Sequence, residues 1–176
     1  MKRTLLLKLV AECISRNAGS FNRDIIQSNV GKYRMYGYEF EGFAKVITSI
    51  NSYFEANMSL RSKETRDHLF DNNRPIYTKI RDDMVTKYGL GAEVRDSIIA
   101  NGCVIDGKVE NSIIFRGVKI EKGAKVSNCV LMQDTVIGEN CNISYVISDK
   151  DVIIKEDRTL MGFQSYPVYI SKASMV

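Results

Sequence analysis

The side chains best suited to acid–base or metal chemistry are scarce in this sequence. His68 is its single histidine and lies in the charged stretch RDHLF. Cys13, Cys103, Cys129 and Cys141 form no C-x-x-C pair. Zinc sites need Cys and His ligands at short spacing, so we expect reduced, mostly buried thiols and no zinc site. Asp82 and Asp83 could hold a cation, but adjacent acids on a connector are usually only solvated.

Composition excludes several classes of function. The net charge is +4, with 25 basic and 21 acidic residues intermixed, and no basic block alternates with aromatics, so nucleic acid is not an expected partner. The first residues, MKRTLLLKLVAEC, predict an amphipathic helix, because apolar residues recur there with helical spacing, at Leu5, Leu6, Leu9, Val10, Cys13 and Ile14. Lys8 interrupts the apolar run that a secretion signal would need. No apolar run approaches the ~20 residues that span a bilayer. We therefore expect a cytoplasmic protein without a membrane partner.

An aliphatic residue recurs at an interval of six in four copies of one pattern from Gly91 onward. The pairs are Ile99 and Ile105, Ile114 and Ile120, Leu131 and Ile137, and Ile147 and Ile153. A further aliphatic, Val109, Val126 or Ile143, follows in the first three copies. A period of six fits neither a helix nor a simple hairpin. It is typical of a chain that winds round a triangular prism and stacks these side chains inward.

The fold class is therefore mainly β, a left-handed parallel β-helix of hexapeptide repeats with about four coils. Gly and Asn fall where the chain would turn corners, and both tolerate unusual backbone angles. These residues are Gly102, Gly107, Gly117, Gly123, Gly138, Asn101, Asn128 and Asn140. The less favoured alternative is an antiparallel sandwich, which would need several hairpin signals where the sequence has one Asn-Gly. The open ends of a short solenoid require cover, from the C-terminal tail, the N-terminal helices or another subunit.

A small α/β region precedes the coils. The pattern predicts a helix near the start, a short apolar element at Phe21 to Ile26 and a strand at Tyr33 to Phe40. A second helix should begin after Thr48 or Ser49, either of which could cap it. We place the boundary of two domains at 1–73 and 74–176, the second holding a connector and the β-helix.

Many hexapeptide β-helices are acyltransferases that use a histidine between coils as a general base. Here His68 lies outside the coils, which disfavours this alternative. The sequence also has no Gly-rich phosphate loop and no G-x-S-x-G motif. It shows no catalytic residue of its own.

Several segments in order resemble the C-terminal part of bacterial glucose-1-phosphate adenylyltransferase. FNRDII from Phe21 resembles the family's DF-x-x-DII element, and GYEFEGFAKVITSINSYFEANMSL from Gly37 resembles the strand and helix that close its nucleotidyltransferase domain. RPIYTK from Arg74 resembles its connector, and DSIIANGCVIDGKVENSIIFRGVKI its β-helix. The resemblance implies that residues 1–73 are a remnant of the transferase domain, whose nucleotide loop is absent here.

One departure from the family pattern concerns its metal ligand. Catalytic members carry Y-W-x-D-V-G-T-I-x-x-Y, whose Asp holds the catalytic Mg²⁺. Aligned on SYFEAN, this sequence has Val46 at the Asp position and Thr48 at the Gly position. Valine offers no oxygen to a hard cation. The resemblance is therefore to the regulatory, non-catalytic type of subunit, inactive alone and without a cofactor, with Mg²⁺ and ATP expected only in the catalytic partner.

The resemblance implies a role in ADP-glucose and glycogen synthesis through subunit assembly and allosteric modulation. The expected partner is a catalytic glucose-1-phosphate adenylyltransferase subunit in a homo- or hetero-oligomer, with a phosphorylated effector. Lys172, in YISKAS, resembles an effector-binding lysine of relatives, and Arg74 and Lys79 on the connector are further candidates. Alternatives are a hexapeptide acyltransferase, a transferase for another sugar 1-phosphate such as mannose 1-phosphate, or a purely structural module.

Overall fold

The computed structural model describes residues 1–78 and 82–176. The chain divides into two compact units, Met1–Glu41 and Gly42–Val176. The boundary predicted at residues 73 and 74 thus falls inside the second unit. The assignment of residues 1–73 to a transferase remnant stays a prediction.

The first unit is a short helical assembly. It contains α1 (Arg3–Ser15), the π-helix η1 (Phe21–Ile26) and the 3₁₀ turn η2 (Gln27–Asn29). Leu9 of α1 and Ile25 of η1 are its buried apolar side chains. The amphipathic N-terminal helix is confirmed, because Leu9 lies in the middle of the apolar positions that predicted it.

The strand predicted at Tyr33 to Phe40 is wrong. The chain forms no strand from residue 34 to residue 47, all of which the structure describes. Tyr36 and Tyr38 are 87% and 88% exposed, so this aromatic run packs against little. A single β-rich segment needs neighbouring strands to hold it extended, and this unit offers none.

The second unit contains three parallel sheets of five strands, and the predicted parallel β-helix of hexapeptide repeats is confirmed. Sheet B consists of β1 (Lys87–Tyr88), β4 (Val104–Ile105), β7 (Lys119–Ile120), β10 (Val136–Ile137) and β13 (Ile153–Ile154). Sheet C consists of β2 (Glu93–Arg95), β5 (Lys108–Glu110), β8 (Lys125–Ser127), β11 (Asn142–Ser144) and β14 (Thr159–Met161). Sheet D consists of β3 (Ile98–Ile99), β6 (Ile113–Ile114), β9 (Val130–Leu131), β12 (Val146–Ser148) and β15 (Val168–Ile170).

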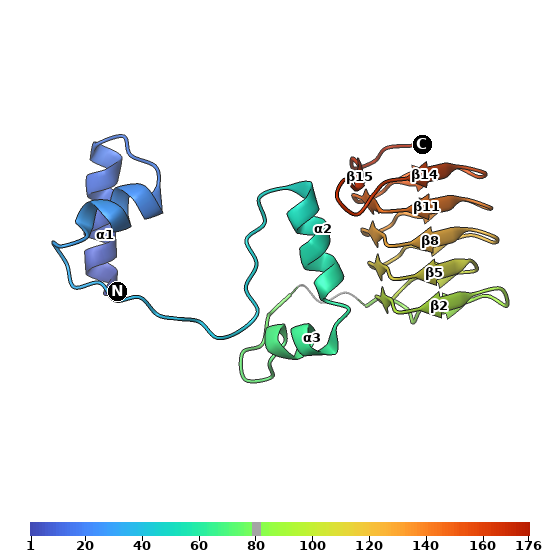
Figure 1. The fold of residues 1–176 in the computed structure, drawn as a ribbon, viewed down its shortest axis with the longest axis horizontal. Coiled ribbons are helices and arrows are strands. Elements are labelled where there is room, and N and C mark those ends of the chain that lie inside the picture. The colour runs from blue at the N-terminus through green and yellow to red at the C-terminus, as the bar shows by residue number, and fades with distance from the viewer. Residues whose placement is uncertain (79–81) are drawn as a thin grey trace. The chain divides into compact units, whose positions relative to one another are not determined.

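Each turn of the chain contributes one strand to each sheet, and successive turns lie one above another, as Figure 1 shows for the strands of sheet C. Ile105, Ile120 and Ile137 stack in register and are at most 1% exposed. Val109, Val126 and Ile143 form a second inward column on sheet C. These dry columns are the hydrophobic core that the six-residue period predicted.

The predicted register of the fourth coil is wrong by one residue. Ile153 is 39% exposed, whereas Ile154 pairs with Ile137 and is fully buried. Ser148 pairs with the inward-facing Leu131. A shift of one residue in a strand moves its side chains to the opposite face, so Ile147 lies on the outside of sheet D.

Ile147 is nevertheless buried, because a helix covers it. α2 (Ile50–Ser59) lies alongside sheet D, and Phe54 of α2 packs against Val130 and Ile147. The outward-facing Ile147 is therefore as well shielded from water as an inward-facing residue would be. This is why hydrophobicity alone favoured the wrong register.

The corners of the prism form columns of residues with positive φ. The corner between sheets C and D uses Asp96, Asn111, Asn128 and Tyr145. The other two corners use Gly102, Gly117, Asp134, Asp151 and Ala173, and Gly123, Asn140 and Asp157. Gly107 and Gly138 are needed for a different reason from the one predicted. A Cβ on Gly138 would lie 2.5 Å from the backbone nitrogen of Glu156, so close packing between coils excludes it.

The C-terminal tail continues the winding. The amide of Val176 donates to the carbonyl of Ile153 at 2.9 Å, and the amide of Lys155 donates to the carbonyl of Val176 at 2.8 Å. The tail thus pairs with part of the edge of β13, which an open solenoid would leave unpaired.

α2 begins with a capping box formed by Ser49 and Ser52, which confirms one of the two predicted caps. α3 (Lys63–Leu69) follows, within the stretch SKETRDHLF, for which the sequence predicts a short helical turn. Arg66 of α3 donates to the carbonyl of Leu60 at 2.8 Å, and Arg61 donates to Asn111 at the corner of the second coil at 2.8 Å. The first bond holds α3 to the end of α2, and the second joins the segment after α2 to the β-helix.

Candidate functional site

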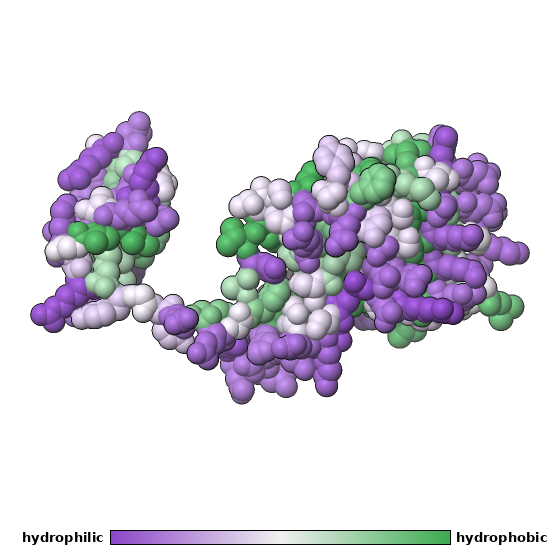
Figure 2. All heavy atoms as spheres, viewed as in Figure 1, coloured by the Kyte–Doolittle hydropathy of each residue, from purple (hydrophilic) through white to green (hydrophobic). Residues whose placement is uncertain are grey.

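The three side faces of the β-helix differ in their cover. Sheet D is covered by α2 through Phe54, Val130 and Ile147. The outer side chains of sheet C are polar or charged on most strands. In Figure 2, hydrophilic residues cover much of the visible side of the coils. Sheet C is therefore the face on which charged groups are presented in a regular array.

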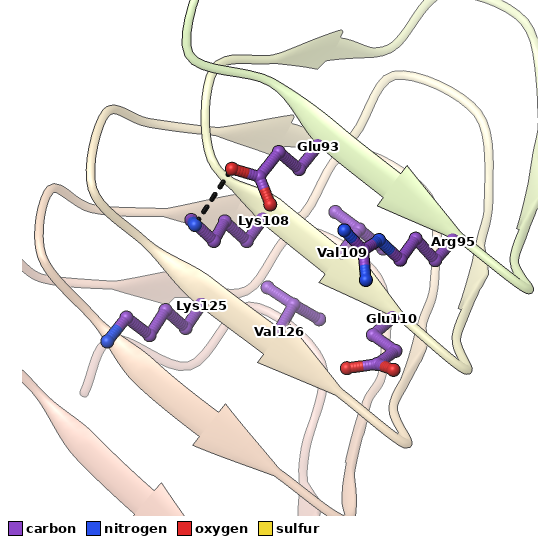
Figure 3. Close-up of a pocket in the computed structure, with 7 residues that line it drawn as sticks. All are labelled: Glu93, Arg95, Lys108, Val109, Glu110, Lys125 and Val126. Atoms are coloured by element: carbon purple, nitrogen blue, oxygen red, sulfur yellow. Dashed lines mark ion pairs between the residues drawn. The ribbon is translucent and has the colours of Figure 1, made fainter.

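The charged array occupies the strands β2, β5 and β8. The first and third residues of each strand face outward, and the middle valine faces the core. Figure 3 shows Glu93, Lys108 and Lys125 on successive strands, with Arg95 and Glu110 at the other end of β2 and β5. A shallow hollow of about 200 Å³ lies among these side chains. We call this surface, formed by Glu93, Arg95, Lys108, Glu110 and Lys125, the charged face.

Electrostatics couple the neighbouring charges of this face. The Nζ atom of Lys108 lies 2.8 Å from Oε1 of Glu93. The hydrogen bond from Lys108 lowers the pKa of Glu93, its Coulomb attraction acts in the same direction, and partial burial opposes both. Both side chains are more than half exposed, so the pair adds little stability. The charged face can recognise charges on a partner, but it holds no nucleophile paired with a base.

An apolar groove lies at the other end of the unit, between the start of α2 and the last coil. Ile47, Ile50, Tyr53, Met132 and Tyr169 line one part of it, with a volume of about 380 Å³. Ile50, Tyr166, Pro167 and Tyr169 line an adjoining part of about 560 Å³. The hydroxyl of Tyr169 donates to Asp149 at 3.2 Å at its edge. The groove is a second surface that could receive a partner.

The structure places the predicted effector residues on separate segments. Lys172 follows β15, is 61% exposed and lies 3.8 Å from Asp151. Arg74 follows α3, and its Nε lies 3.4 Å from Asp71. Lys79 lies outside the described residues. The effector role of these three residues stays a prediction.

Lys172 shares its corner with a second lysine. The amide of Ala173 donates to the carbonyl of Lys150 at 3.0 Å, so Lys150 and Lys172 lie on adjacent turns of the chain. Lys150 is exposed as well. The sequence analysis did not name Lys150, because its proximity to Lys172 arises only when the tail joins the last coil.

The residues with a possible link to acid–base or metal chemistry lie at exposed or salt-bridged positions. His68 is exposed on α3, outside the strands of the coil, and Val46 is 82% exposed. Asp83 pairs with Arg116 at 3.7 Å. Across residues 1–78 and 82–176, no three His, Cys, Asp or Glu side chains gather closely enough to hold a metal ion.

All four cysteines are free thiols, of which Cys103, Cys129 and Cys141 are buried and Cys13 is partly exposed. This confirms the prediction of reduced, mostly buried thiols. Burial raises the pKa of Cys129 to about 12 and also raises the pKa of Cys103. A buried thiol with a raised pKa is a poor nucleophile.

The charged face is a feature that the sequence analysis missed. Its signal was present as opposite charges two residues apart, in E-V-R at Glu93 and K-V-E at Lys108. Such spacing places both charges on one side of a strand. Which charge of the next strand lies beside each of them, however, depends on the pairing register between coils, which these charges do not reveal.

Comparison with known proteins supports the hexapeptide fold and the similarity to glucose-1-phosphate adenylyltransferases. Residues 83–165 match the family described as GlmU-like, C-terminal hexapeptide. The chain is 44% identical over 135 residues to the glycogen biosynthesis protein GlgD of Bacillus subtilis strain 168, covering 77% of this chain and 39% of that protein. It is 36% identical over 137 residues to a glucose-1-phosphate adenylyltransferase of Acetivibrio thermocellus, covering 77% of this chain and 32% of that protein.

A third relative extends the match toward the N-terminus. The chain is 35% identical over 161 residues to a glucose-1-phosphate adenylyltransferase of Bacillus mycoides, covering 89% of this chain and 42% of that protein. The chain thus spans less than half the length of the curated relatives it matches. Among the described residues, no helix is both long and apolar enough to cross a membrane.

Proposed function

We propose that this chain is the C-terminal part of a regulatory subunit that acts in ADP-glucose synthesis for glycogen, in the cytoplasm. The observation that carries the proposal is its 44% identity to a protein named for glycogen biosynthesis, with weaker identity to glucose-1-phosphate adenylyltransferases. The proposal assigns the chain to assembly and allosteric modulation. The nucleotidyl transfer itself belongs to a catalytic partner subunit.

The absence of the expected metal ligand supports a non-catalytic role. Val46 occupies the position at which the resemblance places the Mg²⁺-holding Asp, and its side chain is 82% exposed in a segment without regular structure. Valine cannot supply the oxygen that Mg²⁺ requires. Without that metal the developing charge of a phosphoryl-type transfer lacks its main stabilisation.

An assembly role agrees with the surfaces that the β-helix presents. The apolar groove beside Tyr169 and the charged face are both exposed and are built on strands and a helix with fixed positions. Rigid elements make precise binding surfaces because little conformational entropy is lost on association. We therefore assign subunit contacts to the second unit.

The corner that holds Lys150 and Lys172 is the proposed effector site. Two exposed lysines on adjacent turns can together attract a phosphate group, although Asp151 beside Lys172 competes for it. Arg74, on a separate segment, and Lys79 stay further proposed effector contacts, independent of this corner. Substituting Lys172 with Glu should weaken the response to a hexose bisphosphate, while Lys155→Glu, also exposed, should leave it unchanged.

The test combines this chain with the catalytic glucose-1-phosphate adenylyltransferase of the same organism and measures ADP-glucose formed from ATP and glucose 1-phosphate. We expect no product from this chain alone, co-elution with the catalytic subunit, and a changed rate or effector response. A chain that neither binds the catalytic subunit nor alters its kinetics contradicts the proposal. Acetyl transfer from acetyl-CoA, abolished by His68→Ala, would instead support an acyltransferase.

A further inference from the structure

On each of the neighbouring strands β2 and β5, the two outward-facing charges have opposite signs. β2 presents Glu93 and Arg95, and β5 presents Lys108 and Glu110, with the inward valine between them in each strand. The order of signs is reversed from one strand to the next, because Glu93 pairs with Lys108 and Arg95 with Glu110 in the sheet register. Within one chain this produces the cross-strand pair of Glu93 and Lys108 at 2.8 Å.

The same arrangement is complementary to itself. A two-fold axis that runs along the stack of coils, over the column of Val94 and Val109, exchanges the first and third residues of every strand. A second copy facing this sheet then places its Arg95 opposite Glu93 and its Glu110 opposite Lys108. We propose that the charged face binds a second copy of this chain in this antiparallel, two-fold arrangement.

The other strands of sheet C are compatible with the same rotation. It sets Lys125 opposite Ser127, Asn142 opposite Ser144, and Thr159 opposite Met161, so no like charges meet. Opposite charges that face each other across an interface select the partner and its register, whereas like charges exclude it. The whole sheet therefore accepts its own copy without repulsion.

The other two faces are less suited to this contact. Sheet D is covered by α2 through Phe54. On sheet B the same rotation pairs Lys119 with Glu121, but it sets the exposed Ile153 opposite Lys155. An apolar side chain against a charged one gains neither packing nor an ion pair. Sheet C is thus the face whose chemistry selects a second copy.

The size of the face sets the strength of the contact. Five strands spaced ~4.8 Å apart and three residues wide give roughly 250 Å² of flat surface per partner, well below the ~800 Å² of a stable complex. The dimer is therefore weak when this face acts alone. Because the pairs are exposed at the rim, salt at about 0.5 M should weaken it strongly compared with about 10 mM.

The test uses charge reversal in the whole chain and sedimentation equilibrium at low salt. Lys108→Glu sets two glutamates against each other at each contact, and Glu110→Lys does the same with two lysines. The dimer affinity of each variant alone should be at least about tenfold lower than that of the unmodified chain. An equimolar mixture of the two variants restores both ion pairs and should form heterodimers as tightly as the unmodified chain.

The control for Lys108→Glu is Lys119→Glu, which makes the same change of net charge on sheet B and should leave dimerisation unchanged. Circular dichroism verifies that each variant keeps its fold, and Lys108→Gln with Glu110→Gln replaces any reversal that unfolds. An unmodified chain that stays monomeric overturns the proposal. So do single reversals without effect, a mixture that fails to recover, or a control that weakens the dimer equally. Dimerisation does not depend on the catalytic partner, so this outcome is separate from that of the proposed function.

Discussion

The aromatic rings of Phe54 and Tyr145 lie with their centroids 6.1 Å apart and their planes tilted by 49°. Phe54 belongs to α2, and Tyr145 occupies the corner between sheets C and D in the fourth coil. Tyr145 has φ of 53°, at a corner position where the first three coils have Asp or Asn. The tyrosine adopts a backbone conformation that suits it poorly, and its side chain helps to fasten the helix to the coil.

Replacing Phe54 with alanine should detach α2 from sheet D. Phe54 is 3% exposed and packs on Val130 and Ile147, so we expect a loss of about 3 kcal/mol in the free energy of unfolding. Ten residues are too few for a stable isolated helix, so the amides of α2 should also lose protection from hydrogen exchange. The control is Phe163→Ala, 73% exposed, which should change stability by less than ~0.5 kcal/mol. Equal effects of the two substitutions would contradict the packing described.

Two substitutions of Tyr145 should separate the effect of lost packing from that of backbone strain. Tyr145→Ala and Tyr145→Asn both lose the contact with Phe54, but alanine tolerates positive φ less well than asparagine does. Tyr145→Ala should therefore be less stable than Tyr145→Asn by about 1 kcal/mol in urea unfolding. At Asn142, which lies on extended β11, replacement by alanine should show no comparable penalty. A Tyr145→Ala variant as stable as Tyr145→Asn would show that φ at this corner is not strained.

The register of the fourth coil can be read from two adjacent isoleucines. Ile154 is fully buried and stacks on Ile137, so Ile154→Ala should cost about 2–5 kcal/mol of unfolding free energy. Ile153→Ala removes a side chain that is 39% exposed and should cost less than about 1 kcal/mol. Both substitutions remove the same atoms, so each is the control of the other. The opposite ranking would restore the register that the sequence pattern first predicted.

The thiol of Cys129 should make the folded state sensitive to alkaline pH. Burial raises its pKa to about 12 from an ordinary value near 9, so the folded state holds the proton that the unfolded state releases. The stability from this thiol is fully present below pH 9 and declines as pH rises toward 12. The decline from one such group is at most about 1.4 kcal/mol per pH unit. Urea unfolding between pH 8 and 10 should show a shallower decline in Cys129→Ala, and an unchanged slope would contradict it.

The architecture of the coil was predictable because it is encoded in a short period. Ile105, Ile120 and Ile137 recur at matching places in successive repeats, and stacking them is the arrangement that keeps all three from water. Ser49 and Ser52 likewise indicate the start of α2, because a capping box involves only residues close together in the sequence. Such features depend on residues near one another in the chain or on a repeat that the chain displays.

Three features were not predictable in this way. They are the register of Ile153, the cover of Ile147 by a helix and the position of Lys150 beside Lys172. Each depends on which turn of the chain comes to lie against which, over separations that the local pattern does not encode. The candidate effector residues came from a resemblance, whereas the proximity of Lys150 to Lys172 depends on the pairing of the tail with the last coil.

The repeat of aliphatic side chains was enough to establish that the C-terminal half winds into a dry triangular column, because every turn meets the same hydrophobic demand. The outward surfaces of that column have no such demand, since water satisfies a polar or charged side chain wherever it lies. Only the folded chain therefore decides that Glu93 meets Lys108, that sheet D is covered by α2 and that the outer side chains of β2 and β5 in sheet C stay exposed.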